Sequence, residues 1–172
     1  MHTLSLLFMI VYIWVSESDD QLLLGRSLAK GGESNVIKWA LFVLFSGIEA
    51  RGFIFGPPIA LAIGAKFVPL RKPKKLPGEV ISEKYILEYG SDCLEMHVGA
   101  VESGDRALVV DDLVATGGTL CAAMNLLERA GAEVVECACV IEVPDLKGRE
   151  RLRSHGKPLY VLVESQFEPN SQ

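Results

Sequence analysis

The chain has 172 residues, of which 49% are hydrophobic and 23% charged, and 17 basic against 22 acidic side chains give a formal charge of −5. This composition excludes an intrinsically disordered chain and is that of one globular domain with a sizeable core. Because nucleic-acid-binding proteins usually carry an excess of Lys and Arg, we expect no nucleic-acid partner. A soluble domain that acts on a small molecule is the expectation.

An almost unbroken apolar run, Leu4–Val15, lies near the N-terminus. It is too short to cross a bilayer as a helix, which needs about 20 apolar residues. Its length suits the core of a signal peptide, but no Lys or Arg precedes it and no small-residue cleavage pattern follows. Three interpretations stay open: a signal or anchor, a buried element, or an aberrant N-terminal extension. For the protein as a whole we expect no membrane attachment.

From about residue 41 onward, short apolar strands alternate with helix-like stretches. In chain order the pattern predicts a buried strand over 40–45, a loop over 47–52, a short helix over 58–65 that Pro57 and Pro58 begin, a strand over 67–70, a loop over 71–78, an extended segment over 83–89, a strand over 107–110, a helix over 119–130, and strands over 133–141 and 159–163. Apolar strands without alternation, joined by helices, are typical of a parallel sheet covered on both faces. We therefore predict a doubly wound α/β fold.

The four cysteines, Cys93, Cys121, Cys137 and Cys139, are too few for a disulfide scaffold. Cys137 and Cys139 stand two residues apart in a predicted strand, so that both thiols share one face. No histidine follows at a spacing typical of metal ligands. We expect buried, reduced thiols and hence a reducing compartment.

Ligands of such sheets bind at the carboxyl ends of the strands, which directs attention to the segment DDLVATGGT over 111–119. The amides around Gly117 and Gly118, with a helix N-terminus behind them, form an anion site, and Thr116 and Thr119 add hydroxyl donors. Asp111 and Asp112 suit hydrogen bonds from sugar hydroxyls or a positively charged transition state. These parts predict a ribose-phosphate site; the alternative is a tight strand-to-helix turn with Asp as a cap. Neither a Walker loop nor a Gly-x-Gly-x-x-Gly motif is present.

The segment VVDDLVATGGT over 109–119 resembles the phosphoribosyl-pyrophosphate signature of the type I phosphoribosyltransferases. GIEARGF over 47–53 and RKPKKLPG over 71–78 narrow the resemblance to the adenine phosphoribosyltransferases, and LEYG over 87–90 agrees with their mobile loop. The resemblance covers roughly residues 47–163, and several details look like the plant forms. It implies a central, mostly parallel sheet flanked by helices.

The resemblance also implies an activity. Adenine and 5-phosphoribosyl 1-pyrophosphate would react to AMP and pyrophosphate in purine salvage, in a cytoplasmic homodimer, with Mg²⁺ bound mainly through the substrate. A non-catalytic phosphoribosyl-pyrophosphate binder, a regulatory partner that lost base binding, is the alternative.

Each matching position takes a role from the family. Asp111 and Asp112 would contact the ribose hydroxyls, and Arg51 would lie near the base and pyrophosphate, after a cis peptide bond that follows Glu49. Glu88 would handle the proton on the purine, and Tyr89 would close over the site. The remaining assignments are the 5′-phosphate loop, made of Ala115, Thr116, Gly117, Gly118 and Thr119, and the pyrophosphate-binding cations, Arg71, Lys72 and Lys75.

One part of the family pattern has no match. Members usually begin with a hood segment that covers the adenine, and nothing between Met1 and Phe45 is similar to it. We therefore divide the chain into an atypical N-terminal segment over 1–40, a phosphoribosyltransferase domain over 41–166 and a tail over 167–172. A second basic cluster, Lys147, Arg149, Arg151 and Arg153, is expected to be a solvated face.

Overall fold

The computed structural model describes residues 44–87 and 90–164. The predictions for Leu4–Val15, for the first part of the strand over 40–45, for Glu88 and Tyr89 and for the tail fall outside these ranges. The described elements are β1 (Leu44–Ile48), α3 (Gly52–Ile63), β2 (Lys66–Leu70), β3 (Val80–Leu87), β4 (Gly90–His97), β5 (Arg106–Val114), α4 (Gly118–Arg129), β6 (Glu133–Glu142), the 3-10 turn η1 (Pro144–Leu146), α5 (Gly148–Ser154) and β7 (Leu159–Glu164).

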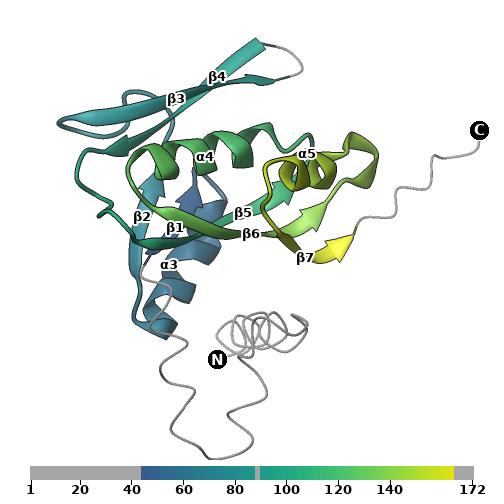
Figure 1. Cartoon of the computed structure of the whole chain (residues 1–172), viewed down its shortest axis with the longest axis horizontal. Coiled ribbons are helices and arrows are strands. Elements are labelled where there is room, and N and C mark those ends of the chain that lie inside the picture. Colours follow the sequence, from purple (N-terminus) through teal and green to yellow (C-terminus); the bar gives the residue numbers. More distant parts are fainter. Residues whose placement is uncertain (1–43, 88–89, 165–172) are drawn as a thin grey trace, which may run out of the picture.

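Five of the strands form a parallel sheet in the order β2-β1-β5-β6-β7, which confirms the predicted fold class. Helix α3 lies on one face of this sheet, and α4 lies on the other (Figure 1). Strands β3 and β4 form an antiparallel hairpin that stands over α4 (Figure 1). Because β1 and β5 are neighbours and parallel, the segments that follow them leave the sheet at the same edge.

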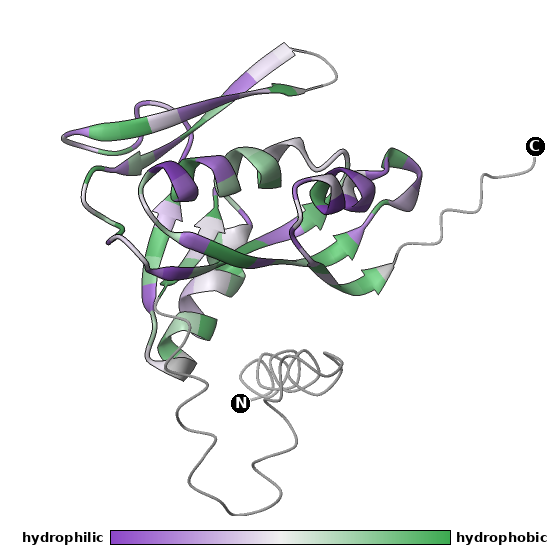
Figure 2. Cartoon of the chain, in the orientation of Figure 1, coloured by the Kyte–Doolittle hydropathy of each residue, from purple (hydrophilic) through white to green (hydrophobic). Residues whose placement is uncertain are grey.

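The sheet separates two clusters of buried apolar side chains. The larger cluster joins α4 to the sheet and to the hairpin, with Leu120 and Met124 packed among residues such as Leu94 and Val109. The smaller cluster lies under α3 and includes Phe45 and Leu108. Hydrophobic residues are concentrated in the central strands, whereas α5 is largely hydrophilic (Figure 2). The non-alternating strand pattern therefore has its physical cause in burial on both faces.

The predicted start of the first helix was wrong. Helix α3 begins at Gly52 rather than at residue 58, and Pro57 and Pro58 lie inside it. The first turn forms because the amides of Phe53 and Ile54 donate to the carbonyls of Ala50 and Arg51. The prolines then lack the N–H groups that would follow in the helical ladder, a cost that packing of the helix on the sheet outweighs.

Two strands are longer than predicted. Strand β1 continues through Gly47 and Ile48, which were assigned to a loop. Strand β5 continues through Asp111 and Asp112 to Val114, because its pairing with β6 persists to the register pair Val114 and Glu142. The two carboxylates therefore stand on the end of a strand and not in the connecting loop.

The second basic cluster is not uniformly solvated, so this expectation was wrong for Arg149. Its Nε donates to both carboxylate oxygens of Glu142, at 3.1 and 2.9 Å, and its Nη1 donates to the carbonyl of Leu159 at 3.0 Å. Arg149 thus ties α5 to strands β6 and β7. Lys147, Arg151 and Arg153 are exposed, as expected.

All four cysteines are free, as predicted. Cys121, Cys137 and Cys139 are buried, and Cys93 is half-buried. Burial raises the pKa of the Cys137 thiol to about 12. Among the described residues no group of three His, Cys, Asp or Glu side chains could hold a metal ion. None of the helices in the described ranges combines the length and the apolar character that crossing a bilayer requires.

Candidate functional site

A cavity of about 250 Å³ opens at the carboxyl ends of β1 and β5, where the topology leads us to expect a ligand. Its walls come from three segments: residues 48–51 from the end of β1 onward, residues 111–120 from the end of β5 into α4, and Lys72 after β2. The two sequence motifs that lie more than fifty residues apart are thus brought to one place by the pairing of β1 with β5.

The loop from Ala115 to Thr119 forms the floor of the cavity. Gly117 adopts the left-handed conformation with φ 75°, and α4 begins at the next residue without a side-chain cap. The first amides of α4 therefore have no side-chain partner, and with the hydroxyls of Thr116 and Thr119 nearby they can bind an anion. The start of α5 supports this loop from behind, since a Cβ at Gly148 would lie 2.3 Å from the carbonyl oxygen of Ala115.

Two consecutive carboxylates, Asp111 and Asp112, stand beside the loop over 115–119. Asp111 is 8% exposed, and its Oδ1 accepts the backbone N–H of Asp112 at 2.9 Å. Burial, to which the neighbouring Asp112 charge adds, raises the pKa of Asp111 to about 7, although Arg51 acts in the opposite direction. Asp112 forms an ion pair with Arg51, with 3.0 Å between Nε and Oδ2. The cavity therefore offers one buried carboxyl and one paired carboxylate.

Glu49, to which the sequence analysis gave no role, holds the basic loop in position. Its carboxylate accepts the backbone N–H of Lys72 at 2.9 Å and Nε of Arg71 at 3.1 Å. Burial acts to raise the pKa of Glu49, but these hydrogen bonds outweigh it, so that the pKa lies below its ordinary value. The Glu49–Ala50 peptide is cis, as the resemblance implied. Because Glu49 lies inside the motif over 47–53, its place in that motif could have identified it as a site residue.

Lys72 lines the cavity, but its ammonium group contacts side chains of the β3–β4 hairpin. Its Nζ donates to the hydroxyl of Tyr85 at 2.8 Å and forms an ion pair with Asp92. Burial acts to lower the pKa of Lys72, but its two partners raise it above the ordinary value. The sequence analysis did not assign Tyr85 or Asp92, because neither belongs to a motif and the hairpin register alone brings them to Lys72.

The other two predicted cations, Arg71 and Lys75, do not line the cavity. Arg71 turns toward Glu49, and its Nη1 donates to the carbonyl of Lys75 at 3.2 Å. The side chain of Lys75 is exposed. The structure thus brings together Arg51, Lys72, Asp111, Asp112 and the whole loop over 115–119, whereas Glu88 and Tyr89 lie outside the described residues.

Residues 25–165 match the family model of the phosphoribosyl transferase domain. Over 119 residues the chain is 84% identical to adenine phosphoribosyltransferase 4 of Arabidopsis thaliana, a match that covers 69% of this chain and 64% of that protein. It is 73% identical over 120 residues to adenine phosphoribosyltransferase 1 of Triticum aestivum, covering 70% of this chain and 65% of that protein. The chain thus spans slightly less than two thirds of the length of these curated relatives.

Solved structures agree with the fold. An adenine phosphoribosyltransferase from Rhodothermus marinus is 49% identical, with a TM-score of 0.69 over 72% of this chain and 70% of that one. The enzyme from Saccharomyces cerevisiae, solved with an imino-altritol bisphosphate and adenine, is 40% identical, with a TM-score of 0.67 over 74% of this chain and 76% of that one.

Proposed function

The chain belongs to the phosphoribosyltransferase domain family, and on this basis we propose that it is an adenine phosphoribosyltransferase, which converts adenine and 5-phosphoribosyl 1-pyrophosphate to AMP and pyrophosphate. The observation that carries the proposal is the cavity, in which two consecutive carboxylates, Asp111 and Asp112, lie next to helix amides that have no side-chain cap. The names of the plant relatives supply the base, adenine.

The sugar phosphate would lie along the β5–α4 segment. The loop over 115–119 would bind the 5′-phosphate through its amides and through the hydroxyls of Thr116 and Thr119. Asp111 and Asp112, at the start of the same segment, would accept hydrogen bonds from the ribose hydroxyls. This order, carboxylates first and amides second, matches the order of hydroxyls and phosphate along a ribose 5-phosphate.

The reaction breaks the bond between the anomeric carbon and pyrophosphate and forms a bond to a purine nitrogen. Positive charge develops on the ribose ring in the transition state, and the carboxylates of Asp111 and Asp112 would stabilise it. Negative charge develops on the leaving pyrophosphate. Arg51 and Lys72, which line the cavity, would neutralise that charge, together with Arg71 and Lys75 of the same basic loop as Lys72.

We also propose that Mg²⁺ accompanies the pyrophosphate. Mg²⁺ is usually held by one or two carboxylates together with substrate phosphates, so the donor set of Asp111 and Asp112 fits it. The described residues include no cluster of three ligands, so the diphosphate and ribose oxygens would supply the remaining bonds. When bound, the ion would neutralise charge on the leaving group.

Two roles are proposed from the resemblance alone. Glu88 would handle the proton of the purine, and Tyr89 would close over the site to exclude water. A cytoplasmic homodimer is likewise proposed; the unbridged thiols and the exposed Ile54 and Leu61 on α3 are compatible with it.

The decisive experiment is an assay of AMP formation by the purified full chain with adenine, phosphoribosyl pyrophosphate and Mg²⁺. The sample should first show one cooperative unfolding transition, so that inactivity cannot come from unfolded protein. Turnover with adenine supports the proposal. A folded chain that binds phosphoribosyl pyrophosphate but forms no AMP would contradict it and identify a non-catalytic binder.

A further inference from the structure

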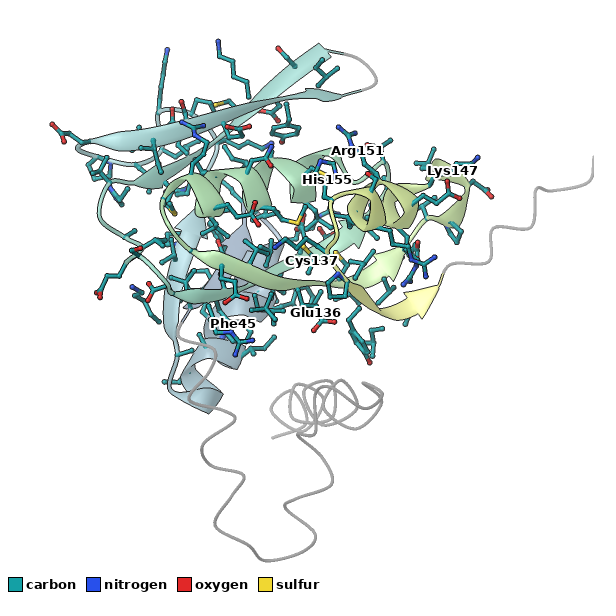
Figure 3. The ribbon with its side chains drawn as sticks, viewed as in Figure 1. Phe45, Glu136, Cys137, Lys147, Arg151 and His155 are labelled. Atoms are coloured by element: carbon teal, nitrogen blue, oxygen red, sulfur yellow. The ribbon has the colours of Figure 1, made fainter. Side chains whose placement is uncertain are left out.

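Arg151, on α5, reaches the start of α4. A Cβ built on Gly118 would lie 3.4 Å from Nη1 of Arg151 and 3.3 Å from the carbonyl oxygen of Ile86 in the hairpin. The guanidinium is therefore within about 5 Å of the Gly118 Cα, since a bond to Cα adds about 1.5 Å. In Figure 3 Arg151 and His155 lie on the side of α5 nearer to α4, and Lys147 lies on its far side. The sequence analysis had assigned Arg151 to a solvated face.

The charge of Arg151 is available to a ligand. No carboxylate among the described residues lies within ion-pair distance of its guanidinium, unlike those of Arg51, Arg71 and Arg149. Arg151 has contact with the buried thiol of Cys121: burial raises the pKa of that thiol, and the charge and hydrogen bond of Arg151 act against this. A neutral thiol leaves the positive charge of the guanidinium uncompensated.

The phosphate loop itself has no positive side chain. The segment LVATGGT over 113–119 contains neither Lys nor Arg, yet a sugar phosphate brings a charge close to −2 at neutral pH. Lys72 and Arg51 are paired with Asp92 and Asp112. The helix N-terminus contributes only about half a positive charge. A dianion on the loop therefore lacks a cationic partner, and Arg151 stands at the loop.

We propose that Arg151 is a further phosphate-binding residue of the site, which supplies the cationic contact for the 5′-phosphate that the loop over 115–119 lacks. This inference rests on the proposed function, because it takes the ligand to be a ribose 5-phosphate ester.

The test uses the full chain with the substitution Arg151→Gln and the matched control Arg153→Gln. Arg153 is exposed on the same helix and lines a different cavity, together with Glu142 and Lys147. The measurements are kcat, KM for phosphoribosyl pyrophosphate, and inhibition by two probes, ribose 5-phosphate and inorganic pyrophosphate. Thermal unfolding of each variant establishes that the fold is intact.

We expect Arg151→Gln to raise KM and the inhibition constant for ribose 5-phosphate about tenfold, because a charge-assisted hydrogen bond is lost. The inhibition constant for pyrophosphate and kcat should stay unchanged, Arg151→Lys should recover part of the loss, and Arg153→Gln should resemble the unaltered chain. An unchanged constant for ribose 5-phosphate, or equal losses for both probes, would overturn the inference.

Failure of the proposed function gives a different result. If the unaltered chain makes no AMP, direct titration with ribose 5-phosphate still compares three proteins: the unaltered chain, Arg151→Gln and Arg153→Gln. Weaker binding by Arg151→Gln alone would then support the inference while the transferase activity is rejected. Equal binding by all three proteins would reject the inference.

Discussion

The ion pair between Arg51 and Asp112 joins the ends of two neighbouring strands, with 3.0 Å between Nε and Oδ2. Arg51 follows β1 and Asp112 lies near the end of β5, and the parallel pairing of Gly47 with Val110 brings them together. The cation proposed for the base and pyrophosphate is thus held by a carboxylate proposed for the ribose. Substrate must compete with this pair when it enters the cavity.

Replacing Arg51 by Gln should affect activity far more than stability. The Arg51 side chain is 71% exposed, so loss of the ion pair should change the free energy of unfolding by no more than about 1 kcal/mol. We expect kcat/KM to fall more than tenfold, about 1.4 kcal/mol of transition-state stabilisation. Steady-state kinetics and denaturant unfolding measure the two quantities. A variant with normal kcat/KM would reject the assignment of Arg51 to the site.

Replacing Asp111 or Asp112 by Asn should lower kcat/KM at least tenfold with the fold intact. The unaltered chain should also depend on pH, because the pKa of Asp111 is raised to about 7. Since the carboxylate is the form that stabilises the positive ribose ring, kcat/KM should increase as the pH rises through about 7. In Asp111→Asn this increase should be absent, whereas Asp112→Asn should retain it. A pH profile common to both variants would contradict this role of Asp111.

Substitution of Lys72 or Lys75 by Ala should weaken inhibition by pyrophosphate. Lys72 must leave Asp92 and Tyr85 to reach the ligand, so its contribution should be the smaller one. Lys84→Ala is the matched control, since Lys84 is exposed on the same hairpin as Tyr85 and does not line the cavity. The measurement is the inhibition constant of pyrophosphate, with phosphoribosyl pyrophosphate as the varied substrate. If the variants of Lys72 and Lys75 both behave like the control, the basic loop does not bind pyrophosphate.

A methyl group at Gly148 should disturb the phosphate loop from behind. In Gly148→Ala the new Cβ would lie 2.3 Å from the carbonyl oxygen of Ala115 and 3.1 Å from the amide nitrogen of Gly117, so backbone must move. We expect a loss of about 1–3 kcal/mol in stability and weaker ribose 5-phosphate binding. A Gly148→Ala protein as stable as the unaltered chain would show that α5 does not support the loop.

Glu136→Gln should stabilise the protein at neutral and higher pH. Glu136 is 7% exposed on the α3 face of β6, its Oε2 has no hydrogen-bond partner among residues 44–87 and 90–164, and burial raises its pKa to about 7. Figure 3 shows it on the opposite side of the sheet from Cys137. Because the raised pKa makes the folded state bind more protons than the unfolded state, stability falls as pH rises from about 4.5 to about 7.

The difference in unfolding free energy between Glu136→Gln and the unaltered chain should therefore grow across that range and stay constant above it. Its full size should be on the order of 3 kcal/mol, from the size of the pKa shift. Chemical denaturation at pH 5 and pH 8 measures it. A difference that does not change with pH would mean that folding does not raise the pKa of Glu136, and would contradict the prediction.

The residue pattern alone predicts the fold class and singles out the loop over 115–119 and the two carboxylates before it as candidate site residues. These depend on local chemistry: apolar strands buried on both faces, glycines that admit an anion to the backbone, and a helix that follows directly. The free thiols could likewise be predicted, whereas the cis bond after Glu49 was implied by the family resemblance. The predicted start of the first helix was wrong, because Pro57 and Pro58 lie inside α3. Packing of this helix on the sheet outweighs the preference of proline for the first helical turn.

The pairing of the charges, by contrast, depends on how the chain folds in three dimensions. Glu49 and Arg71 are 22 positions apart, Lys72 and Asp92 are 20 apart, and neither partner identifies the other in the sequence. The position of Arg151 beside Gly118 follows from the packing of α5 on the loop, which no motif encodes. Long-range contacts of this kind depend on strand register and helix placement, and these are properties of the whole packed sheet rather than of any segment.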